Sequence, residues 1–160
     1  MTMETQERTA SFFRFEDLRI YAKSLDYCNW IATAMREPRT DVERNLVNTF
    51  CRSAYDIALN IAEGSSRSKN QFEHYLKISK TAIRECIVFT ELASKQGLIS
   101  DESKDNSREL LMEMTRMIGA LILSLQRGSG RRHDDDSRDN ELPEIEEAND
   151  DPLDAIDTNF

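Results

Sequence analysis

Four segments of this chain each combine helix start and stop signals with a helical spacing of apolar residues, and they constrain the fold more than any other feature. The second and third segments open with capping boxes, in which a hydroxyl and a Glu or Gln three residues later satisfy free amides. Glycines follow the last apolar residues of the second, third and fourth segments, and a glycine in the left-handed conformation commonly ends a helix. The expected helices run from Glu16 to about Met35, from Thr40-Asp41 to Gly64, from Ser68-Lys69 to Gly97 and from Ser100-Asp101 to Gly128. Their short connections predict an all-α, antiparallel up-and-down four-helix bundle over residues 15–127.

Apolar residues recur every three or four positions along these helices, as in the seams that pack inside a bundle. The expected core stripes include Phe50, Ile57 and Ile61 in the second helix, Leu76 and Ile83 in the third, and Leu111, Met114 and Ile118 in the fourth. The first helix carries two stripes, one with Leu18, Tyr21, Leu25, Cys28 and Ala32, the other with Ile20, Tyr27, Ile31 and Ala34. Two stripes favour self-association into a homo-oligomer. The alternative is one wide buried face inside a single bundle.

The net charge of −9 belongs to the C-terminal part of the chain. Residues 128–160 contain 12 acidic residues against three arginines, whereas residues 1–127 are neutral overall. Such a composition cannot bury enough apolar surface to order itself, so residues 128–160 are expected to be a disordered acidic tail. Residues 1–14 are expected to be a flexible N-terminus.

The expected location is the cytoplasm. The first residues lack a signal-peptide pattern, and no apolar run approaches the roughly 18 residues that cross a bilayer. Three cysteines, an odd number set among apolar neighbours, are typical of buried free thiols in a cytosolic protein. No membrane association is expected.

The chain resembles the four-helix-bundle proteins encoded in intervening sequences of bacterial 23S ribosomal RNA genes. The string Asn60-Ile61-Ala62-Glu63-Gly64 is the most specific part of the likeness, which covers roughly residues 15–127. The other matching stretches are Phe15-Glu16-Asp17-Leu18, Arg52-Ser53-Ala54 and Phe72-Glu73-His74-Tyr75-Leu76-Lys77-Ile78-Ser79, with Glu85 and Leu92 further along. The approach Tyr55-Asp56-Ile57-Ala58-Leu59 departs from the family by placing an acid where a small neutral residue is usual.

The resemblance implies a homopentamer and no catalytic residues. A more distant similarity, to the accessory variability determinant of diversity-generating retroelements, implies association with a reverse transcriptase and with nucleic acid. An acidic tail is additional to the compact domain of the family.

The Asn60–Gly64 string is interpreted as a tight helix corner. Gly64 permits the left-handed conformation that ends a helix, Asn60 is placed to hydrogen-bond to a neighbouring helix or loop, and Glu63 is placed to pair with Arg67. The alternative is a binding site at this corner that also includes Ser65, Ser66 and Lys69.

Cations on the third helix are the best candidates for contacting nucleic acid. Lys77, Lys80 and Arg84 fall on one helical face, and Lys69 lies earlier in the same helix. Aligned cations contact phosphates and make binding salt-dependent. An ordinary solvated face is the alternative, because Glu73 stands four residues before Lys77 and is placed to pair with it.

No enzyme activity is expected. Neither His74 nor His133 accompanies a nucleophile and an orienting acid, and the sequence has no Gly-rich phosphate loop and no metal-ligand spacing. We therefore predict no catalytic residue, no cofactor and no metal.

The leading hypothesis is a non-enzymatic homo-oligomeric scaffold that binds RNA or DNA, or a nucleic-acid enzyme such as a reverse transcriptase. The alternative is an adaptor whose acidic tail binds a protein partner, with the bundle serving only for oligomerisation. In the adaptor, Leu153, Ile156 and Phe160 are the candidate anchors. The tail is equally expected to fold back over the third-helix cations and compete with nucleic acid, or to act only as a solubilising segment.

Overall fold

The computed structural model describes residues 11–130. The expectations for residues 1–10 and 131–160, including the disordered tail and its anchors Leu153, Ile156 and Phe160, lie outside the described residues. The described part consists of a 3-10 helix and four α-helices, with no strand. The elements are η1 (Arg14–Asp17), α1 (Arg19–Ala34), α2 (Asp41–Ser65), α3 (Lys69–Lys95) and α4 (Asp101–Gly130).

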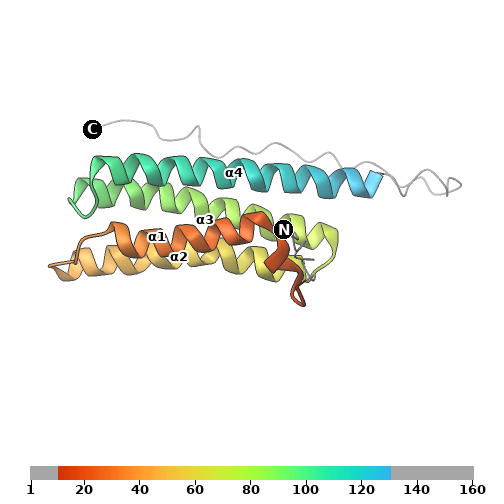
Figure 1. Cartoon of the computed structure of the whole chain (residues 1–160), viewed down its shortest axis with the longest axis horizontal. Helices are drawn as coiled ribbons and strands as arrows, with labels where there is room; N and C mark the ends of the chain where they lie inside the picture. Colours follow the sequence, from red (N-terminus) through yellow and green to blue (C-terminus); the bar gives the residue numbers. More distant parts are fainter. Residues whose placement is uncertain (1–10, 131–160) are drawn as a thin grey trace, which may run out of the picture.

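Each helix packs against the next one along the chain, and α1 also contacts α4, which closes the bundle. Figure 1 shows the four helices side by side along one long axis, with η1 beside the start of α1. The longest interface joins α2 to α3. The predicted all-α four-helix architecture is confirmed.

Three of the predicted helix starts are capped by a hydroxyl. Thr40 accepts a hydrogen bond from the Glu43 amide at 3.1 Å, and Ser100 accepts one from the Ser103 amide at 3.1 Å. Ser68 accepts from the Gln71 amide in the same way. Gly97 follows α3 with φ of +66°, the left-handed conformation that ends a helix at little cost only in glycine.

Three predicted boundaries are wrong. The α-helix α1 begins at Arg19 instead of Glu16, because Leu18 is extended and separates it from η1. Gly64 does not end α2, which continues to Ser65, and Gly128 does not end α4, which continues to Gly130. Both glycines therefore keep ordinary helical backbone angles, and Gly97 is the one described glycine with a positive φ.

The core forms where the predicted stripes of α2, α3 and α4 meet the Ile20–Tyr27–Ile31 stripe of α1, which confirms these four stripes. The other α1 stripe is only partly buried, and its members Leu25 and Ala32 are exposed. The fully buried apolar side chains are contributed by all four helices and include Tyr27 and Ile31 from α1, Phe50, Ile57 and Ile61 from α2, Leu76 and Ile83 from α3, and Leu111, Met114 and Ile118 from α4. Outside its main stripe, α4 also carries the apolar residues Leu110, Met117 and Ile122, which are partly buried against this core. Their presence is explained by a wide buried face.

A chain of buried hydroxyls crosses this core between three helices. Thr90 of α3 donates to the Cys86 carbonyl at 2.8 Å, which uses its only hydroxyl hydrogen. Ser107 of α4 must therefore donate to Thr90, at 2.8 Å, and accept from the Tyr27 hydroxyl of α1, at 2.9 Å. Burial raises the pKa of Tyr27, so the phenol stays protonated and keeps this donor role.

Candidate functional site

The outer seam between α3 and α4 contains a hollow of about 380 Å³ rimmed by cations. Lys80 and Arg84 project from α3 and Arg116 from α4. The floor between them is apolar and consists of Ile87 and Met112 above the buried Ile83, with Thr115 at one side. We call this hollow the α3–α4 groove.

Two glutamates on α3, one before and one after the stretch that lines the α3–α4 groove, are each already paired with residues of their surroundings. Glu73 accepts from Lys77 at 2.9 Å and from Gln126 at 3.0 Å. Glu91 contacts Lys104 at 2.9 Å and Arg108 at 2.7 Å. The hydrogen bond from Lys77 lowers the pKa of Glu73, and the hydrogen bond from Lys104 does the same for Glu91. Both carboxylates are thus held ionised by their own partners.

The middle of the seam carries positive charge that no carboxylate balances. Within residues 11–130, Lys80, Arg84 and Arg116 form no ion pair. None of the side chains that line the groove is acidic. The groove is therefore an anion-attracting surface of three cations over an apolar floor.

The structure brings together two of the four cations that the sequence singled out. Lys77 forms an ion pair with Glu73. Lys69 lies near the end of the bundle, beside Gly128. Only Lys80 and Arg84 reach the α3–α4 groove, where Arg116 joins them. Sequence reasoning missed Arg116, because its position relative to α3 depends on how the two helices are rotated in the bundle.

The helix-corner residues are satisfied within their own turns. The predicted Glu63–Arg67 ion pair is present. The expected cross-helix hydrogen bond of Asn60 is wrong, because its amide donates to the Asp56 carbonyl of the same helix at 2.7 Å. Ser65 and Ser66 donate to the carbonyls three residues before them, at 2.8 and 2.9 Å. Ser65 and Lys69 also line a hollow of about 500 Å³ together with Arg14 and Arg67, so a binding site at this corner stays a prediction.

Gly64 has a packing role that replaces the predicted conformational one. It is buried in α2 against the first turns of α3. A Cβ built on it would lie 2.6 Å from the Cβ of Tyr75 and 2.8 Å from Cδ2 of Phe72. Only glycine permits this approach of α2 to α3.

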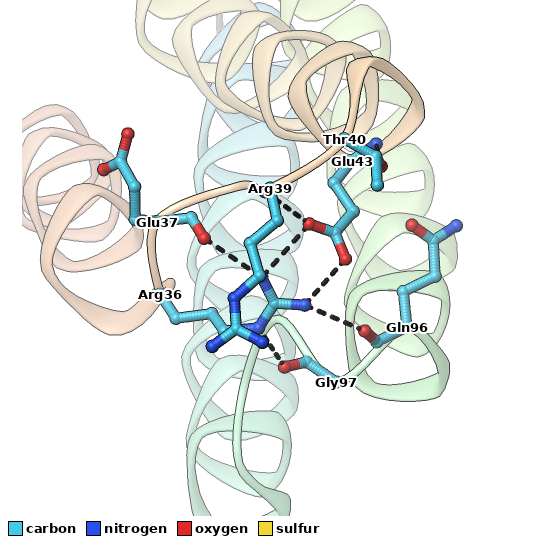
Figure 2. A network of polar contacts seen from close by, with 7 residues as sticks. All are labelled: Arg36, Glu37, Arg39, Thr40, Glu43, Gln96 and Gly97. Atoms are coloured by element: carbon cyan, nitrogen blue, oxygen red, sulfur yellow. Dashed lines mark hydrogen bonds and ion pairs between the residues drawn. The ribbon is translucent and has the colours of Figure 1, made fainter.

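A polar cluster that sequence reasoning missed joins the α1–α2 connection to the end of α3 (Figure 2). The Arg36 guanidinium donates to both oxygens of Glu43, at 2.7 and 3.1 Å, and to the Gly97 carbonyl at 2.8 Å. Glu43 also accepts from the Arg39 amide at 2.7 Å. These hydrogen bonds, the one from Arg36 above all, lower the pKa of Glu43 to about 2. The Arg36 guanidinium donates all its hydrogen bonds inside the cluster, also to the Glu37 and Gln96 carbonyls, so the role of the cluster is to fix two loops.

The remaining reactive side chains form no catalytic arrangement in the described part of the chain. His74 is exposed and packs edge-on against Tyr75. Cys28, Cys51 and Cys86 are free thiols, and burial raises the pKa of each of them, which disfavours the reactive thiolate. No group of three His, Cys, Asp or Glu side chains among residues 11–130 is placed to hold a metal ion.

The length and apolar character of the described helices decide whether any of them could span a bilayer. None of them, between residues 11 and 130, combines the length and the apolar character needed to cross a membrane.

The family described as 23S rRNA-intervening sequence protein matches residues 16–120, which include all of α1, α2 and α3 and most of α4. No curated protein matches the chain.

Proposed function

The chain belongs to the 23S rRNA-intervening sequence protein family, and on that premise we propose that it is a non-enzymatic, homo-oligomeric scaffold that binds nucleic acid or a nucleic-acid enzyme such as a reverse transcriptase. The observation that carries nucleic-acid binding is the α3–α4 groove, where three cations lack any acidic partner in the described residues. Phosphates are the natural counter-charge for such a surface. Repetition around a homo-oligomer, a pentamer by the family resemblance, would multiply this surface.

Self-association is supported by an apolar face on α1 and α2. Leu25 is 45% exposed, Tyr55 51% and Leu59 62%. The half-buried thiols Cys28 of α1 and Cys51 of α2 lie near each other in this face, where burial and then the charge of Cys51 raise the pKa of Cys28. Contiguous apolar surface of this kind is typical of an interface between protein chains. We call these five residues the α1–α2 face.

Charge reversal in the groove tests nucleic-acid binding. In the full chain, the triple substitution Lys80→Glu, Arg84→Glu and Arg116→Glu is expected to weaken binding of a fluorescent single-stranded RNA at least tenfold, measured by anisotropy. Loss of three phosphate contacts should also make the dependence of log affinity on log salt shallower by about 2, because each contact to a single strand contributes about 0.7. A circular dichroism melt checks that the variant is folded.

The matched control reverses three exposed cations elsewhere, Arg19→Glu, Arg52→Glu and Lys95→Glu. It changes net charge equally, so it should keep most of the affinity if the groove is the binding site. Equal losses in the two triple variants would contradict a groove-specific site, and an unaffected groove variant would remove the proposal.

Light scattering coupled to size exclusion tests self-association. The full chain is expected at about five times the protomer mass of 18.5 kDa. Tyr55→Glu with Leu59→Glu should lower that mass, because it places charges in the α1–α2 face. Val88→Glu with Leu92→Glu has the same spacing on exposed positions of α3 and should leave the mass unchanged. A monomeric full chain would contradict the scaffold.

A further inference from the structure

The apolar floor of the α3–α4 groove makes no favourable contact with a phosphate group, which binds through the cations. Ile87 and Met112 form apolar surface between the three cations, with the buried Ile83 beneath them, and Met112 is 46% exposed. A nucleic-acid backbone would use the cations and leave this floor without a partner. The groove therefore also fits a ligand that alternates acidic and apolar groups.

One segment of this chain has that chemistry. Residues 141–147 read Glu-Leu-Pro-Glu-Ile-Glu-Glu, with four carboxylates around Leu142 and Ile145. The negative charge complements the three groove cations, and the two aliphatic side chains match the apolar floor. Pro143 disfavours a helix through this stretch, which suits an extended segment lying along a seam.

The length of the chain allows the contact within one protomer. Arg116 lies 14 residues before Gly130, the last residue of α4, so the groove begins about 21 Å back along the helix at 1.5 Å per residue. Residues 131–141 can span about 36 Å when extended. Tethering raises the effective concentration of the segment at the groove to about the millimolar range, so a weak contact is sufficient.

We propose that residues 141–147 dock in the α3–α4 groove of their own chain, with Leu142 and Ile145 on the apolar floor of Ile87 and Met112 and the glutamates opposite Lys80, Arg84 and Arg116. The docked segment occupies the phosphate-binding cations, so nucleic acid must displace it. This regulatory consequence rests on the proposed function, whereas the docking itself does not.

The test follows the methyl signals of the six methionines in the full chain by NMR, without nucleic acid. Leu142→Ser with Ile145→Ser is expected to shift the Met112 signal, because the groove loses its occupant. Leu153→Ser with Ile156→Ser makes the same chemical change further along the chain and should leave Met112 in place. Met114, which is fully buried, should stay unshifted in both variants and reports on the fold. The substitution Met112→Leu assigns the signal.

A Met112 signal that does not move in the Leu142/Ile145 variant overturns the docking, and equal shifts in both variants overturn its assignment to residues 141–147. RNA affinity gives a separate readout, with an increase of about fivefold expected for the Leu142/Ile145 variant alone. A shift of Met112 with no RNA binding by any variant would retain the docking and reject the proposed function, so the two can fail independently.

Discussion

Replacing Gly64 with alanine is expected to destabilise the protein by about 2 to 3 kcal/mol, although alanine is the better helix former. The new Cβ would lie 2.6 Å from the Cβ of Tyr75, which is bonded directly to the α3 backbone and cannot rotate away. Phe72, at 2.8 Å, restricts the other side. The two helices must therefore move apart at their longest interface. Urea unfolding followed by circular dichroism measures the change at fixed protein concentration.

Gly119 is the control for this substitution. It also lies inside a helix, but a Cβ built on it meets nothing within 4 Å. Gly119→Ala is therefore expected to stabilise the protein by about 0.5 to 1 kcal/mol through helix propensity alone. If both alanine variants are stabilised, the close approach at Gly64 is not a constraint.

Replacing Ser107 with alanine is expected to cost about 1 to 3 kcal/mol, because it removes the middle member of the buried hydroxyl chain. The Tyr27 hydroxyl, in a side chain only 1% exposed, loses its acceptor at 2.9 Å and cannot reach water instead. Thr90 keeps its bond to the Cys86 carbonyl. The free energy of unfolding of the variant, again from urea titration, measures the loss.

Tyr27→Phe provides the comparison, because it removes the donor and leaves Ser107 bonded to Thr90. Its cost should be smaller than that of Ser107→Ala. The double variant should cost less than the sum of the two single variants, since no hydroxyl is then stranded. Strict additivity would show that the two hydroxyls do not depend on each other.

Local signals in the sequence predicted most of the architecture. Thr40, Ser68 and Ser100 cap helices as expected, since a hydroxyl beside free amides acts within one turn and needs no tertiary partner. The stripes through Phe50, Ile83 and Ile118 became core for a similar reason, because their spacing alone defines a buried face. Family membership was predicted from the Asn60–Gly64 string and is confirmed.

The candidate site was predicted only in part. Lys80 and Arg84 belong to the α3–α4 groove, and the proximity of Lys77 to Glu73 was readable from their spacing of four residues. The sequence did not predict that Arg116 lies in the groove, because its position there depends on the rotation of α4 relative to α3. The Arg36–Glu43 cluster was missed for the same reason, since its other acceptors belong to the end of α3.

By itself, the sequence determined the four helices, three of their caps, the faces that they bury and the family. These properties depend on interactions within a turn or on the period of one helix, which the order of residues contains directly. Only the tertiary structure decided that Gly64 is a contact point rather than a helix end, that Asn60 bonds within α2, and that Arg116 joins Lys80 and Arg84. Each of these depends on the distance and rotation between two packed helices, which side chains from both helices set together.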